Sequence, residues 1–183
     1  MKIEPEKFKA DWNNVAPEKV VEILRLSELY LQGQLMRLEQ ADQRSLGLLS
    51  VAVPSALALF GASLSALSST DLPSAIGYGG IVAAVFLLIA TKFAFAALDP
   101  TPFYIAGNSP ENLLDKNDLE ARSRIELLAE YAEFNQAGIE RNAVILADRS
   151  KNIRKAITVF LLSPIAGAAV IAASMLLANI FSA

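Results

Sequence analysis

Residues 46–67 read LGLLSVAVPSALALFGASLSAL, and this stretch decides the fold class. No residue between Arg44 and Asp71 is charged, and nearly all of the stretch is apolar or small. About 22 helical residues are enough to cross the roughly 30 Å hydrocarbon core of a bilayer. The stretch is therefore predicted to be a transmembrane helix. It tolerates Pro54 as a kink because neighbouring helices re-satisfy the freed carbonyl.

Two further apolar runs follow along the chain. Residues 75–98 contain one charge, Lys92, and residues 156–183 contain none. The 183 residues are 54% hydrophobic with a mean hydropathy of +0.40, which is too apolar for an ordinary soluble domain of this size. We predict an all-α integral membrane protein with three transmembrane helices and long cytoplasmic helical extensions. The first two spans, residues 46–67 and 75–98, form a hairpin.

The distribution of basic residues predicts the orientation. None lies in the connection at residues 68–74 or after Lys155, although the chain has 16 lysines and arginines. By the positive-inside rule, the N-terminus and residues 99–155 face the cytoplasm. The predicted localisation is the inner (plasma) membrane, as a multi-pass protein with a cytoplasmic N-terminus.

Residues 1–45 are predicted to form a cytoplasmic segment built on one amphipathic helix. Pro17 and Glu18 suit the first turn of a helix. The helix from there to Arg44 is about 28 residues, or roughly 40 Å, long. Its apolar face must pack on something. The main stripe consists of Val20, Leu24, Leu31, Leu35 and Leu38, with a smaller second stripe of Leu29 and Met36.

Residues 99–155 are predicted to be a cytoplasmic loop followed by a second long helix. Asn117 and Glu120 have capping-box spacing at its start, and its apolar stripe is interrupted by Asn135 and Asn142. Residues 134–138 could instead be the turn of a helical hairpin, but we favour a continuous helix. Both long helices enter the membrane from the same side, so we expect parallel packing within the chain or across an oligomer. Asparagines in such a stripe can set register or bind a ligand.

The composition excludes several catalytic classes. Without cysteine or histidine there is no disulfide, Cys/His zinc site, thiol nucleophile or Ser-His-Asp triad. Residues 77–80, GYGG, lack the following Lys-Ser/Thr of a phosphate loop and are interpreted as a close-packing feature. A net charge of −3 gives no attraction to a nucleic acid polymer. We expect no enzymatic activity, no cofactor and no metal.

Charged residues gather where the spans meet the cytoplasm. Their simplest role is anchoring to anionic headgroups, at about 1 kcal/mol per charge. Alternatively, helix packing gathers several of them into a pocket for an anionic ligand such as a nucleotide phosphate. Asp42 lies on the apolar stripe one turn before the membrane, so it needs a basic partner, either Arg149 or Lys151. The candidate ligand-binding residues are Asp42, Arg44, Arg141, Asn142, Arg149 and Lys151.

Lys92 is the one charge inside the second predicted span. An intramembrane charge is by default a hypothesis of function. The favoured interpretation is that its four-carbon stem snorkels to the cytoplasmic headgroups. The alternatives are a partner for Asp42 or Asp99, or a cation that lines a pore.

Two short motifs resemble a known family. Residues 39–49, EQADQRSLGLL, are similar to the Asp-x-Lys-Ala element that opens the first span of the Pycsar transmembrane effectors and related SLATT-type membrane effectors of bacterial antiphage systems. Here Arg44 and Ser45 stand for the lysine and alanine. Tyr131, Asn142 and residues 149–156 resemble the helix before that family's last span. The resemblance implies an effector that responds to a cyclic nucleotide, forms a homo-oligomer and impairs the membrane.

Two functions remain open from the sequence. The first is a membrane effector that senses a small anionic ligand through its cytoplasmic helices and disrupts the bilayer. The second is a non-catalytic scaffold or regulatory membrane subunit whose cytoplasmic helices dock a partner protein.

Overall fold

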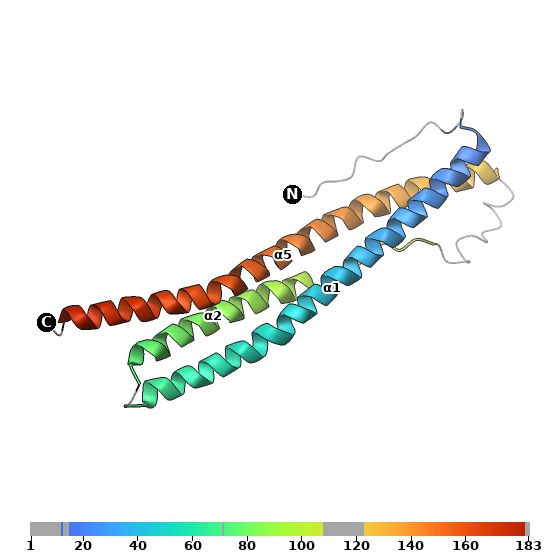
Figure 1. Ribbon diagram of the computed structural model, residues 1–183. Helices are drawn as coiled ribbons and strands as arrows, with labels where there is room; N and C mark the ends of the chain where they lie inside the picture. Colours follow the sequence, from blue (N-terminus) through green and yellow to red (C-terminus); the bar gives the residue numbers. More distant parts are fainter. Residues whose placement is uncertain (1–11, 13–14, 71, 108–122, 182–183) are drawn as a thin grey trace. The chain divides into compact units, whose positions relative to one another are not determined.

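The structure is a computed structural model that describes residues 12, 15–70, 72–107 and 123–181. Three long helices dominate these residues: α1 (Pro17–Ser68), α2 (Ser74–Ala97) and α5 (Arg124–Phe181) (Figure 1). No strand occurs in the described part of the chain, so the predicted all-α class is confirmed. Each of the three helices contains a segment that is long and apolar enough to cross a membrane.

The amphipathic segment and the first apolar run form one helix of 52 residues, α1. Pro54 lies inside this helix and on its exposed side. Proline has no backbone N–H, and the hydrogen bond that Pro54 cannot make is therefore lost away from the packed face of α1.

The helix α5 is continuous over 58 residues and includes residues 134–138, so the alternative of a helical hairpin there is wrong. Its start is a capping box. The Ser123 N–H donates to Glu126 Oε2 at 2.8 Å, and the Glu126 N–H donates to Ser123 Oγ at 3.3 Å. The predicted capping box of Asn117 and Glu120 lies outside the described residues.

The chain divides into two compact units. The helix-pair unit comprises Met1–Glu39 and Pro100–Ala147, and the bundle unit comprises Gln40–Asp99 and Asp148–Ala183. The helices α1 and α5 each contribute residues to both units, whereas α2 belongs to the bundle unit alone.

In the helix-pair unit, α1 and α5 pack side by side and run parallel, as predicted. Ser27 bonds to Asn135, and seven residues later Gln34 bonds to the carbonyl of Ile139 at 3.0 Å. The main apolar stripe of α1 faces this contact, and Val20 and Leu31 are fully buried. The second stripe of α1 stays exposed.

In the bundle unit, α2 packs against both α1 and α5 through small residues (Figure 1). A Cβ atom on Gly79 would lie 2.7 Å from the Gly167 carbonyl oxygen of α5. A Cβ atom on Gly77 would lie 2.5 Å from Leu67 Cγ of α1. The GYGG segment is therefore a close-packing feature, as predicted. Ser163 of α5 adds a hydrogen bond of 2.9 Å to the Ala83 carbonyl.

Candidate functional site

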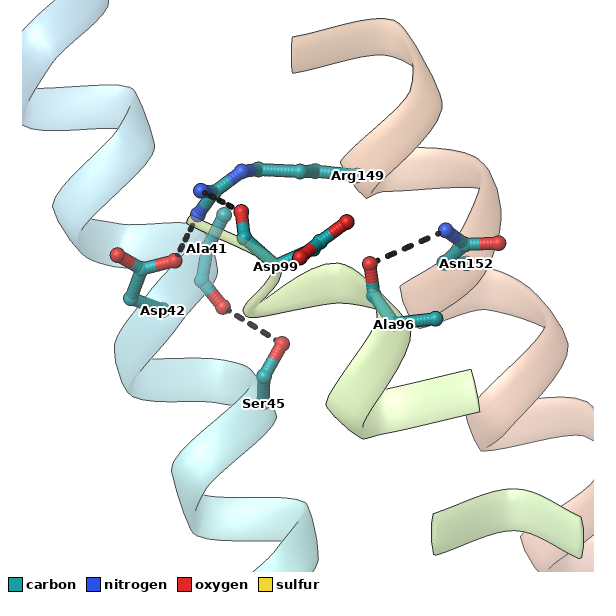
Figure 2. A network of polar contacts seen from close by, with 7 residues as sticks. All are labelled: Ala41, Asp42, Ser45, Ala96, Asp99, Arg149 and Asn152. Atoms are coloured by element: carbon teal, nitrogen blue, oxygen red, sulfur yellow. Dashed lines mark hydrogen bonds and ion pairs between the residues drawn. The ribbon is translucent and has the colours of Figure 1, made fainter. Parts of the chain in front are cut away.

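The polar ends of the apolar helices meet at a buried arginine. Arg149 Nη1 forms an ion pair with Asp42 Oδ1 of α1, and Arg149 Nη2 donates a 2.9 Å hydrogen bond to the Asp99 carbonyl after α2 (Figure 2). The Arg149 side chain is 9% exposed and that of Asp42 is 39% exposed. Arg149 is therefore the basic partner that Asp42 was predicted to need. One guanidinium joins three segments of the bundle unit, and we call this contact the Arg149 bridge.

Local sequence places these groups. The stripe of α5 brings a residue to the packed face every seventh position, so Arg149 continues the series of Asn135 and Asn142. Ser45, one turn after Asp42, is buried, and its hydroxyl donates to the Ala41 carbonyl at 3.0 Å, which satisfies it there.

One donor of the bridge stays unsatisfied. Arg149 Nε is buried and has no hydrogen-bond partner among the residues that the structure describes. A buried donor without an acceptor costs about 1–3 kcal/mol. The guanidinium therefore donates to two acceptors, and its Nε could bind a third acceptor.

The other cations of the candidate set are placed differently. Arg44 and Lys151 of the bundle unit are exposed, and so is Arg141 of the helix-pair unit. None of the three forms a hydrogen bond or ion pair with another described residue. Within the bundle unit, Asp42 and Arg149 are brought together, whereas Arg44 and Lys151 are not part of this contact.

Asn142 is fully buried and holds an extended segment against α5. Its Nδ2 donates to the Tyr104 carbonyl at 2.8 Å, and its Oδ1 accepts from the Tyr104 N–H at 2.9 Å. Gly138 leaves room for the Tyr104 ring, since a Cβ atom there would lie 2.3 Å from Tyr104 Cδ1. Burial also raises the pKa of the Tyr104 hydroxyl. Both the oxygen and the nitrogen of the Asn142 side-chain amide therefore bond to the backbone of Tyr104.

Tyr104 is the residue that the sequence did not identify. A glycine in the middle of a long helix is a signal of close approach by another segment. Gly138, one turn before Asn142, carried that signal. The identity of the approaching segment could not be read from it.

Lys92 lies on the exposed side of α2, and it forms no ion pair with any other described residue. Asp42, one of its suggested partners, is paired with Arg149 instead.

No group of acidic, histidine or cysteine side chains within the described ranges could hold a metal ion. No protein-family model, curated protein or solved structure matches this chain. Chemically, the arrangement offers a buried guanidinium that contacts two acceptors, one of which is a partly exposed carboxylate.

Proposed function

We propose that the three apolar helical segments cross the inner membrane, with the helix-pair unit in the cytoplasm. The bundle unit supports this because its apolar helical segments expose large aliphatic side chains. Leu57, Leu161, Ile165 and Leu176 are each between 61% and 66% exposed. Soluble monomeric proteins rarely expose many large apolar side chains close together. In contact with lipid tails, such side chains do not carry the free-energy cost of exposing apolar surface to water.

The topology is directly testable because the chain has no cysteine. Single cysteines are introduced at Ser69, between α1 and α2, and at Ser123, before α5. An impermeant maleimide added to intact cells is expected to label Ser69→Cys and not Ser123→Cys. The reverse pattern would indicate the opposite orientation. Labelling of both cysteines would contradict the proposed transmembrane segments.

We propose further that the protein is a membrane effector controlled by a small anionic ligand. The Arg149 bridge is the observation that carries this proposal. The Asp42 carboxylate is partly exposed, so an incoming phosphate can replace it at the guanidinium. Phosphate forms bidentate contacts with arginine and would also supply an acceptor for Nε.

The exchange would have a mechanical consequence. Asp42 is the side chain through which α1 holds Arg149 of α5. Its displacement frees the polar end of α1, and the bundle can repack. A ligand moves this equilibrium only by its differential affinity for the two packings. The proposed output is a loss of membrane integrity through oligomerisation. An antiphage role and a cyclic-nucleotide ligand rest on the family resemblance alone.

Isothermal titration with cyclic pyrimidine nucleotides, paired with dye leakage from proteoliposomes, tests the effector. Asp42→Asn is expected to leak without ligand, because the bridge is broken while the side-chain shape is kept. Arg149→Gln is expected to lose ligand heat and ligand-dependent leakage. Arg154→Gln, an exposed cation five residues on, is the matched control and should behave as the parent protein. Equal behaviour of all three variants would reject the role of the bridge.

A second candidate function is a membrane scaffold that docks a partner protein. The exposed apolar side chains of α1 within the helix-pair unit favour it: Leu26 is 51%, Tyr30 is 52% and Met36 is 58% exposed. They lie outside the apolar run, so lipid does not cover them in the proposed topology. No nucleotide heat and no leakage, together with a stoichiometric protein partner, would select this function over the effector.

A further inference from the structure

Two lysines of the bundle unit, one on α2 and one on α5, are exposed on its outer surface. Lys92 is exposed on α2, and Lys155 Nζ of α5 lies 5.3 Å from the centre of the Phe93 ring. The contact with the ring is a cation–π interaction, which holds Lys155 toward α2. Neither lysine has an ion-pair partner within the described part of the chain.

The backbones of Lys92 and Lys155 lie at the same level along the bundle axis. Asn152 of α5 lies against the Ala96 carbonyl of α2, with 3.5 Å between Nδ2 and O (Figure 2). One turn further along α5, Lys155 contacts Phe93, which lies one turn earlier in α2. The two helices therefore run antiparallel, and Lys92, the neighbour of Phe93, shares its level with Lys155.

The local charge at this level is positive. Residues 149–181 contain four basic residues and no acidic one. The acidic residues closest in sequence, Asp99 and Asp148, both lie further toward the polar end than the two lysines. An anion at the level of Lys92 and Lys155 therefore meets no carboxylate.

The surface around Lys92 is apolar on its other side. Val85, Leu88 and Ile89 lie one and two turns away on the same face of α2 and are 45%, 52% and 41% exposed. A lone ammonium among such side chains is costly, and its stem extends toward the nearest polar layer. A ligand that fits this surface needs an anionic head at the lysines and an apolar body along α2.

We propose that Lys92 and Lys155 together bind the phosphate group of one anionic phospholipid, whose acyl chains lie along the exposed face of α2. Basic sites between membrane helices at the cytoplasmic side are suited to such headgroups. The inference rests on the proposed transmembrane topology. It concerns a different surface from the Arg149 bridge.

The test compares lipid retention by the full chain in detergent micelles. Native mass spectrometry measures how much phosphatidylglycerol remains bound relative to phosphatidylcholine after both are offered in equal amounts. The parent protein is expected to prefer phosphatidylglycerol. Each of Lys92→Gln and Lys155→Gln should lower that preference about fivefold, and the double variant up to about thirtyfold. Arg154→Gln removes the same charge one residue away and should leave the preference unchanged.

Three results would overturn the site while leaving the topology intact. These are an unchanged preference in the double variant, an equal loss in Arg154→Gln, or displacement of the lipid by excess inorganic phosphate. The first two would indicate general attraction to anionic headgroups, and the third a site for soluble phosphate. A chain that stays in the aqueous phase without detergent and retains no phospholipid would instead overturn both the topology and the site.

Discussion

The helix-pair unit and the bundle unit are held together in different ways, although α1 and α5 contribute to both. In the helix-pair unit the packed face carries hydrogen-bonding side chains seven residues apart, such as Asn135 and Asn142 of α5. In the bundle unit most buried residues are glycine, alanine or serine, and backbones approach closely at Gly79 and Gly167. Polar pairs in a packed stripe specify register, whereas small residues let backbones approach closely and gain dispersion contacts.

The largest expected effect is in the bundle unit, at Gly79. In Gly79→Leu the new side chain meets the Gly167 backbone oxygen, which cannot move aside without separating α2 from α5. We expect a loss of about 3 kcal/mol, the upper range for overpacking. Denaturation in mixed micelles measures it. Gly61→Leu is the control, because a Cβ at Gly61 of α1 meets nothing within 4 Å. Similar losses in both variants would show that the close approach does not stabilise the bundle.

The next effect is in the helix-pair unit, at Asn142. Asn142→Ala leaves the Tyr104 N–H and carbonyl without their partner, so we expect a loss of about 2 kcal/mol. The chain has a single tryptophan, Trp12, whose indole N–H bonds to Glu133 Oε1 at 2.8 Å. Its fluorescence therefore reports unfolding of this unit. Arg141→Ala, at an exposed neighbouring position, should cost less than about 0.5 kcal/mol. Equal costs for the two variants would contradict the structural role of Asn142.

Asn135→Leu separates specificity from stability in the same unit. Asn135 is buried and donates to Ser27 Oγ at 2.8 Å, so leucine removes one polar pair and adds apolar contact. We expect a stability change of no more than about 1 kcal/mol, of either sign. We also expect more than one oligomeric state by analytical ultracentrifugation in detergent, since a polar residue in the stripe sets the register. A single species identical to the parent would show that Asn135 does not specify association.

The smallest effect is on the exposed outer face of α1. Arg25 donates to the Glu22 carboxylate at 2.7 and 2.8 Å, and this hydrogen bond lowers the pKa of Glu22. Because the folded pKa is lowered, the stabilisation is present above the ordinary carboxyl pKa and is lost as the pH falls through the lowered value. Arg25→Gln should return the Glu22 pKa toward its ordinary value in an NMR titration. An unchanged pKa would show that the pair does not form in solution.

Part of the site was predictable from the sequence and part was not. Asp42 on an apolar stripe required a basic partner, and only Arg149 or Lys151 had a suitable depth on the other long helix. The choice of Arg149 depended on helix rotation, which places Arg149 in the seam and Lys151 outside it. Arg44 and Lys151 have a similar depth in the bundle unit but are exposed, so depth along a helix did not by itself identify the side chains that meet Asp42. The anionic-ligand pocket stays a prediction.

By itself the sequence determined the class of fold, the three apolar segments and the parallel pairing of the two long helices. These follow from hydrophobic periodicity and from the length of uncharged runs, which are local properties of the chain. Only the tertiary structure decided that Asn142 binds Tyr104, that Arg149 also holds the Asp99 carbonyl, and that Lys155 lies over Phe93. Such contacts depend on the rotation and offset of whole helices, and a difference of one residue turns a side chain by about 100°.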